Sequence, residues 1–288
     1  MSAPVPVSFF VNFQDLTSVT RPAYLHELAV NGAKYVVLTS PLLGMILGDP
    51  ELLPAVSREL EAAGLRFLDA HAPYGPRWDL NAPYESDRAA QSARLKAVME
   101  IVASLGLDTM TMHMGTDLIA PELSAQQHFD RSCAMLETLL PTAERLGITI
   151  CLENGMIRNY RTSTLLAVLE KFQSDHLGFC FDSGHCNLKI RTHYAESEKY
   201  ASRMIALHLH DNDGTGDLHQ PPFTGTFNWE WLAEVLKKAD YSMPLNFEIN
   251  QRRSPFYHPE KSDHTDDLRA FLADAKERCD KFVRMCAK

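Results

Sequence analysis

Ionisable side chains of the kinds that bind metals or move protons recur at regular intervals along this 288-residue chain. They follow short apolar runs in the segments "FLDAHAPYG", "TMTMHMG", "ITICLENG", "GFCFDSGH", "IALHLHDND" and "LNFEIN". The side chains concerned are His71, His113, Glu153, Asp182, His185, His208, His210 and Glu248. Carboxylates that converge in a pocket of low dielectric constant repel one another unless a cation binds between them. The set therefore predicts a site for a divalent metal ion.

Eight short apolar segments alternate with amphipathic helical segments along the whole chain. The expected strands are Val7–Phe13, Tyr35–Thr39, Arg66–His71, Thr109–His113, Thr149–Glu153, Gly178–Asp182, Ile205–His210 and Pro244–Ile249. The expected helices include Ser57–Ala63, Ala89–Ser104, Phe129–Arg145, Leu165–Phe172, Trp229–Lys238 and Asp266–Met285. Gly64, Gly106 and Gly147 stand where a left-handed residue would end a helix. With no composition break and no GxGxxG fingerprint, this pattern predicts a single-domain (β/α)8 TIM barrel over residues 1–288.

Strand periodicity tests whether the ionisable residues can meet. Successive side chains of a strand point to opposite faces, so Glu153 shares a face with Cys151 and Thr149, while Leu152 and Ile150 share the other. The sixth, seventh and eighth strand segments separate their large apolar residues from their ionisable ones in the same way. If the apolar face packs on helices, the ionisable side chains point into the mouth of the barrel. Active sites of TIM barrels are built there.

Composition limits the classes of function. Formal net charge is -9, and nucleic-acid binders rely on Lys and Arg, so nucleic acid is not expected as a partner. No apolar run approaches the roughly 18 residues that a membrane helix needs, and the first residues show no secretory signal. We therefore expect a cytoplasmic protein with no membrane partner. The six cysteines form no CxxC pair and are expected to be buried free thiols.

These motifs make the chain resemble the xylose isomerase-like TIM barrel superfamily, which includes sugar isomerases and epimerases and is related to endonuclease IV. The resemblance covers essentially the whole chain. It rests on Glu153, Asp182-x-x-His185, His208-x-x-Asp211 and Glu248 at the ends of strands five to eight. The pair His210-x-x-Asp213 also fits the strand-seven motif, and we favour His208 because His210 would lie one pleat nearer the solvent.

The resemblance implies a metal-dependent sugar isomerase or epimerase that transfers protons through a metal-stabilised enediolate. The implied ligands of one Mn, Mg or Zn ion are Glu153, Asp182, His208 and Glu248. Glu153 and Glu248 would also donate and accept the proton. The candidates for binding a small carbohydrate substrate are His71, His113, His185, His210, Asp217, His219 and Arg158. Relatives of this kind form homodimers or homotetramers, so either state is expected.

Two departures from the family pattern concern the substrate. Ketose 3-epimerases of the superfamily carry an arginine six residues beyond the strand-seven ligand, where this chain has Gly214 or Gly216, depending on the register. They also carry a glutamate shortly after the strand-five ligand, where this chain has residues 156–159, Met-Ile-Arg-Asn. A free-ketose 3-epimerase is therefore not the best match.

A competing interpretation is a zinc-dependent phosphodiesterase similar to endonuclease IV. The chain has candidates for the ligands of up to three Zn ions: His71, His113, Glu153, Asp182, His185, His208, Asp217, His219 and Glu248. The acidic charge and the lack of Arg- or Lys-rich loops near the motifs argue against a DNA substrate. A related lyase, such as a sugar or inosose dehydratase, is a further alternative. A binding protein without activity is disfavoured, because it would not need mutually repelling carboxylates.

Overall fold

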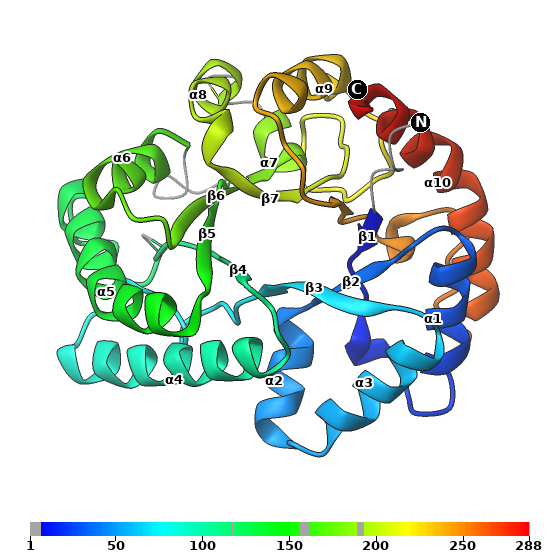
Figure 1. The fold of residues 1–288 in the computed structure, drawn as a ribbon, viewed down its shortest axis with the longest axis horizontal. Coiled ribbons are helices and arrows are strands. Elements are labelled where there is room, and N and C mark those ends of the chain that lie inside the picture. The colour runs from blue at the N-terminus through cyan, green and yellow to red at the C-terminus, as the bar shows by residue number, and fades with distance from the viewer. Residues whose placement is uncertain (1–6, 117, 156–161, 189–192, 288) are drawn as a thin grey trace.

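The computed structural model of the protein describes residues 7–116, 118–155, 162–188 and 193–287. Within this part of the chain, eight parallel strands form one sheet in the order β7-β6-β5-β4-β3-β2-β1-β8 (Figure 1). The strands are β1 (Val7–Phe9), β2 (Tyr35–Leu38), β3 (Arg66–His71), β4 (Thr109–Met112), β5 (Thr149–Glu153), β6 (Leu177–Asp182), β7 (Met204–His208) and β8 (Leu245–Phe247).

The two edges of this sheet meet beyond the end of β7. The Leu209 amide donates to the Asn246 carbonyl at 2.9 Å, and the Glu248 amide donates to the Leu209 carbonyl at 3.0 Å. These bonds bring β7 and β8 together and curl the sheet into a nearly closed barrel. The predicted (β/α)8 fold is confirmed.

Helices surround the ring of strands (Figure 1). They are α1 (Arg21–Val30), α2 (Ser40–Gly48), α3 (Leu52–Ala62), α4 (Glu85–Ser104), α5 (Ala125–Leu146), α6 (Thr162–Phe172), α7 (Ser183–Asn187), α8 (His193–Lys199), α9 (Trp229–Lys238) and α10 (Thr265–Cys286). The backbone φ angles of Gly64, Gly106 and Gly147 are +73°, +72° and +70°, which confirms the predicted left-handed positions after α3, α4 and α5. These glycines let the chain turn from each helix into the next strand.

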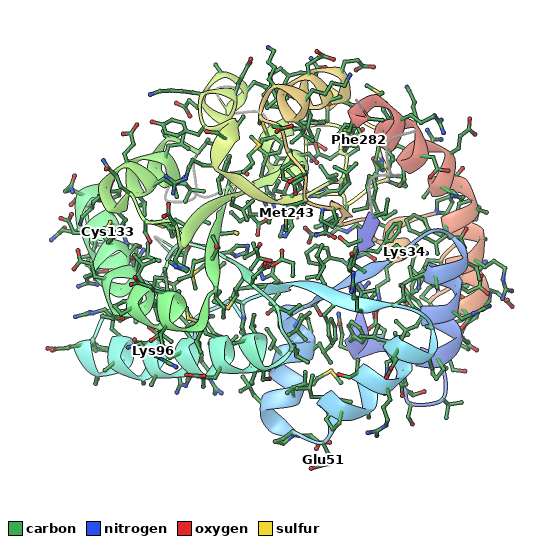
Figure 2. The ribbon with its side chains drawn as sticks, viewed as in Figure 1. Lys34, Glu51, Lys96, Cys133, Met243 and Phe282 are labelled. Atoms are coloured by element: carbon green, nitrogen blue, oxygen red, sulfur yellow. The ribbon has the colours of Figure 1, made fainter. Side chains whose placement is uncertain are left out.

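The side chains divide into two sets, as the strand periodicity predicts. Leu152 and Phe181 belong to the large core between strands and helices, whereas Cys151, Cys180 and Ala206 form a separate cluster inside the barrel. Figure 2 shows side chains filling both spaces. All six cysteines are free and five of them are buried, as expected.

The first strand is shorter than predicted. It ends at Phe9, and Phe13–Asp15 form the 3-10 turn η1 instead of a continuing strand. Val11 and Phe13 are nevertheless 1% and 0% exposed, so the apolar run reflects burial of the following loop. Burial selects apolar residues in loops as it does in strands, which is why the two cannot be separated by pattern alone.

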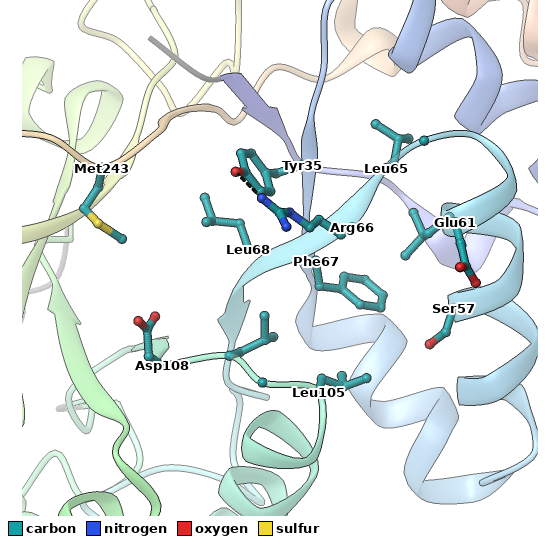
Figure 3. A pocket seen from close by; sticks show the side chains of 14 residues that line it. Tyr35, Ser57, Glu61, Leu65, Arg66, Phe67, Leu68, Leu105, Asp108 and Met243 are labelled. Atoms are coloured by element: carbon teal, nitrogen blue, oxygen red, sulfur yellow. Dashed lines mark hydrogen bonds between the residues drawn. The ribbon is translucent and has the colours of Figure 1, made fainter. Parts of the chain in front are cut away.

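Because all strands are parallel, their amino ends lie at one end of the barrel and their carboxyl ends at the other. A hollow of about 700 Å³ at the amino ends is lined mainly by apolar side chains and by Tyr35, Arg66 and Asp108 (Figure 3). The Arg66 guanidinium donates to the Tyr35 hydroxyl at 2.8 Å there. A second pocket lies at the carboxyl ends. No helix in the described ranges has both the length and the apolar character needed to cross a membrane.

Candidate metal centre and active site

The pocket at the carboxyl ends of the strands has a volume of about 580 Å³ and contains most of the predicted site. Its lining includes seven of the residues singled out in the sequence: His71, His113, Glu153, His185, Asp217, His219 and Glu248. The larger hollow of Figure 3 contains none of them. Chemistry, rather than volume, therefore identifies the candidate active site. Arg158 lies outside the described residues.

Glu153, Asp182, His208 and Glu248 converge at the base of this pocket. One ligand atom from each lies within 4.8 Å of the others. Nδ1 of His208 is 3.2 Å from Oε1 of Glu153 and 3.1 Å from Oε2 of Glu248. Neither His208 Nδ1 nor Glu248 Oε2 makes a hydrogen bond of ordinary geometry within the described chain, although both atoms are buried. Buried ligand-type atoms that converge without hydrogen bonds of ordinary geometry fit a shared cation.

The charges of this cluster compensate one another in the metal-free protein. Burial opposes ionisation of Glu153, but His208 and His113 hold the pKa of its carboxyl well below the usual range. Burial also opposes ionisation of Glu248, yet His208 lowers the pKa of that carboxyl to about 2. The pKa of His208 is correspondingly raised despite burial, by Cys180, Glu153 and Glu248. A bound cation would take over the role of the His208 proton.

A second group of ligand-type atoms lies on one side of Glu153. Nε2 of His71 and Nε2 of His113 are 3.2 and 3.1 Å from Oε2 of Glu153. Nδ1 of His71 donates to the Ala72 carbonyl at 2.9 Å, which leaves the lone pair of a neutral imidazole on Nε2. Two acceptors at 3.2 Å need a proton or a metal ion between them.

A third group lies on the other side, around Asp217. Nδ1 of His219 donates to the Glu248 carbonyl at 3.0 Å, and Nδ1 of His185 donates to the Asn154 carbonyl at 2.8 Å. Their Nε2 atoms are 2.9 and 3.7 Å from Oδ2 of Asp217. Burial would lower the pKa of His219, but Asp217 and Glu248 raise it to about 9. Histidines fixed through one nitrogen by a carbonyl are typical of metal sites.

His210 lies between the central cluster and the third group. Its side chain is 0% exposed, as is that of His208, and it is not among the residues that line the pocket. Its Nε2 lies 3.1 Å from Oδ1 of Asp182, behind the central cluster. Gly184 makes room for the ring, since a Cβ at that glycine would stand 1.9 Å from Cε1 of His210. His210 therefore contacts Asp182 on one side and the third group on the other, where its Nε2 is 3.6 Å from Oδ1 of Asp217 and its ring stacks on that of His219 at 4.2 Å between centroids.

Asp211 of the strand-seven motif is a structural residue. It is 0% exposed, and its carboxylate accepts from Nε1 of Trp229 at 2.9 Å and from the Phe227 amide at 3.1 Å. These bonds anchor the chain before α9.

Sequence reasoning missed the apolar wall of the pocket. This wall consists of Tyr74, Pro76, Leu118 and Ile119, from the loops after β3 and β4. Asp79 also lines the pocket, and burial raises the pKa of its carboxyl to about 6. The one sequence signal that could have indicated this wall is the segment "HAPYG", in which Tyr74 follows His71 by three residues.

Comparison with known proteins identifies a family and several relatives that match over part of their length. A family model described as "Xylose isomerase-like TIM barrel" matches residues 25–275. An uncharacterized protein of Methanocaldococcus jannaschii is 27% identical over 191 residues, 62% of either chain. The 3-oxo-isoapionate decarboxylase of Pectobacterium atrosepticum is 33% identical over 82 residues, 28% of this chain and 29% of that one. The matched regions thus span less than two thirds of these relatives.

Solved structures share the fold over nearly the whole chain. An IolI protein with a bound zinc atom aligns with a TM-score of 0.75 at 15% identity, covering 98% of this chain and 99% of the other. The D-psicose 3-epimerase of Clostridium cellulolyticum H10 also gives 0.75, at 13% identity, covering 98% and 100%. The 3-keto-D-glucoside 4-epimerase of E. coli gives 0.71, at 16% identity, covering 95% and 99%. At such identities the likeness establishes the fold alone.

Proposed function

We propose that this chain, which belongs to the xylose isomerase-like TIM barrel family, is a metal-dependent isomerase or epimerase of a sugar or sugar derivative. The observation that carries the proposal is the pair Glu153 and Glu248. Both carboxylates line one pocket, and both approach Nδ1 of His208 within 3.2 Å. Because they extend from strands three positions apart around the barrel, they can reach a bound substrate from different sides. One can remove a carbon-bound proton while the other returns it.

A divalent Mn, Mg or Zn ion fits the cluster of Glu153, Asp182, His208 and Glu248. The cluster offers three carboxylates and one imidazole from the ends of four neighbouring strands. When bound there, the ion would polarise two adjacent oxygens of a hydroxycarbonyl substrate and offset the charge that develops on proton removal.

The remaining residues bind and orient the substrate. Since His185 donates its Nδ1 proton to Asn154, its Nε2 edge faces the pocket and can hydrogen-bond a substrate oxygen. Glu248 is 20% exposed, whereas Glu153 is 2% exposed, so Glu248 meets the substrate more openly. The proposed reaction is proton transfer through an enediolate, with Glu153 and Glu248 as proton donor and acceptor.

The names of similar proteins support keto-sugars as the substrate class. Two solved structures are named as epimerases of D-psicose and of a 3-keto-D-glucoside. The decarboxylase relative is named for a 3-oxo compound, and decarboxylation likewise develops negative charge beside a carbonyl group. A lyase, such as a sugar or inosose dehydratase, is therefore the alternative on the same site.

The test combines metal content with hydrogen exchange. Purified protein is expected to contain about one divalent ion per chain and to exchange a carbon-bound hydrogen of D-fructose or methyl 3-keto-glucoside with D2O, followed by NMR. Glu153→Gln and Asp182→Asn should lose the ion. Glu248→Gln should slow exchange by about 100-fold or more. The exposed Glu122→Gln serves as a control. Protein that binds no Mn, Mg or Zn, or binds it without exchange, would contradict the proposal.

A second candidate function is zinc-dependent phosphodiester hydrolysis. The specific observation in its favour is that His71, His185 and His219 each donate Nδ1 to a backbone carbonyl and present Nε2 beside a carboxylate. With the central cluster, this arrangement supplies ligands for up to three Zn ions. Two or three Zn per chain, reduced by His71→Ala or His219→Ala, together with cleavage of abasic DNA, would favour hydrolysis over isomerisation.

The proposed partner is a small carbohydrate, and nucleic acid is disfavoured. The described residues lining the pocket include four carboxylates, from Asp79, Glu153, Asp217 and Glu248, and no Lys or Arg to contact phosphates. A cytoplasmic location and a homodimeric or homotetrameric state stay predictions. Sedimentation or light scattering tests the latter.

A further inference from the structure

The metal-centre pocket has a hydrophobic side that its proton chemistry does not use. Among the described residues, the large hydrophobic side chains that stay exposed are Val19, Val30, Leu47, Tyr74, Tyr84 and Leu118. Two of them, Tyr74 at 58% and Leu118 at 74%, line this pocket beside Pro76 and Ile119. Apolar surface that gathers at a polar site is typical of a ligand-binding wall.

Hydrogen bonds join the two loops that carry this wall. The Asp79 carboxylate accepts from the amides of Asn81 at 2.7 Å and Thr116 at 2.9 Å, which joins the loop after β3 to the loop after β4. Ser132 on α5 donates to Oδ1 of Asn81 at 2.9 Å. Gly115 lets the two loops approach, because a Cβ there would stand 2.4 Å from Asn81. The two loops that carry the wall are therefore joined to each other and to α5.

The wall lies directly beside the ligand cluster. The Tyr74 ring is 5.7 Å from the His71 ring and 5.2 Å from the His113 ring, measured between centroids. A pocket of about 580 Å³ has room for a pyranose ring and a substituent of similar size. One molecule can therefore contact the carboxylates with one end and the wall with the other.

We propose that the substrate is an uncharged keto-sugar joined to an apolar or aromatic group, which packs on Tyr74 and Leu118 while the hydroxycarbonyl part lies at Glu153 and Glu248. The described lining contains four carboxylates and no Lys or Arg that could pair with the phosphate of a phosphorylated sugar. This inference rests on the proposed function of the same site. It adds that an aglycone-like group contributes to recognition.

The test compares phenyl 3-keto-glucoside, methyl 3-keto-glucoside and the 6-phosphate of the latter, by calorimetric binding to Mn-loaded protein. Burying the ring should make the phenyl compound bind about tenfold or more tightly than the methyl compound. The 6-phosphate should bind most weakly. Leu118→Asn should remove the phenyl preference without loss of folding, because Leu118 is exposed. Val19→Asn, at an 84% exposed site away from the pocket, should keep it. Tyr74→Ala and Tyr84→Ala form a second pair of variant and control.

Failure of this inference is distinguishable from failure of the proposed function. Equal binding of the phenyl and methyl compounds, unaffected by Leu118→Asn, would overturn the inference even where hydrogen exchange with D2O continues. Tightest binding of the 6-phosphate would overturn it too. Tighter binding of the phenyl compound that depends on Leu118 would support the inference. If none of the three compounds then exchanged hydrogen with D2O, that result would count against the proposed reaction and not against the inference.

Discussion

At the scale of single residues, the site depends on side chains being held by partners behind them. His210 is an example, because it contacts Asp182 at 3.1 Å and fills the space beside Gly184. Partners of this kind orient metal ligands and affect affinity by about 10–100-fold.

Gly184→Ala should therefore weaken metal binding by about tenfold or more, because the new Cβ would displace the His210 ring. Calorimetric titration with Mn measures this. The matched control is Gly44→Ala in α2, where no heavy atom lies within 4 Å of the added Cβ and stability should be unchanged or raised. Unchanged Mn affinity in Gly184→Ala would contradict the proposed role of His210.

His219 gives a pH prediction for the second candidate function, in which a Zn ion binds its Nε2. Its pKa of about 9 in the metal-free protein means that it carries a proton at pH 7, which a metal bound to Nε2 must displace. Metal affinity at this position should rise as pH increases from about 7 to 9 and then level off. The Asp217–His219 pair correspondingly stabilises the metal-free fold below the unfolded pKa of about 6.5, and this contribution is lost as pH rises towards 9. Calorimetry in buffers of different ionisation enthalpy counts the protons released; equal release at pH 7 from the unaltered protein and from His219→Ala would contradict the prediction.

At the scale of elements, the strand ends carry the ionisable side chains of the site, and the loops after β3 and β4 carry the apolar wall beside them. The final helix, α10, holds the barrel from outside, and its first turn contains the buried Asp267. That carboxylate accepts from the His258 amide at 3.0 Å and from Nδ1 of His264 at 3.1 Å, and it pairs with Lys261.

Asp267→Asn should lower the free energy of unfolding by about 1–3 kcal/mol, because a 2% exposed carboxylate loses charge-assisted bonds. Burial opposes its ionisation, but the bonds to Lys261, His258 and His264 hold the pKa of this carboxyl below the usual range. Its contribution is therefore present above the unfolded pKa of about 4 and is lost as pH falls. Urea unfolding at pH 7 and pH 3.5 measures both effects. Asp266→Asn, on the same turn and 82% exposed, should change little.

At the scale of the whole molecule, residues distant in sequence close the barrel. Phe282, near the end of α10, packs against Trp229 of α9 with ring centroids 4.9 Å apart. Trp229 in turn donates to Asp211. Asp211 lies two residues beyond Leu209, whose backbone bonds join β7 to β8. The closing helix is thereby linked to the strand that provides His208.

Phe282→Ala should cost about 3–5 kcal/mol of unfolding free energy, since the ring is 0% exposed and leaves a cavity. The exposed Arg284→Ala, on the same turn, should cost under about 0.5 kcal/mol. Urea unfolding measures both. A loss below about 1 kcal/mol for Phe282→Ala would mean that α10 contributes little to closing the barrel.

The amino-acid sequence by itself determined the barrel fold and which face of each strand is apolar. Alternation along a strand is a local property, so Leu152 and Cys151 could be assigned to opposite faces from their order alone. The helix-ending glycines were equally local, because a left-handed φ favours glycine wherever it occurs. Several ionisable residues at parallel strand ends then had to share one end of the barrel.

Only the tertiary structure decided which of these ionisable residues contact one another. His208 and His210 share a strand face, yet His208 lies beside Glu153 and Glu248, whereas His210 lies beside Asp182 and Asp217. Tyr74 and Leu118 became a wall because Asp79 joins two loops about forty residues apart in sequence. Distances between strands and loops depend on barrel closure and packing, which arise from contacts that local periodicity does not encode.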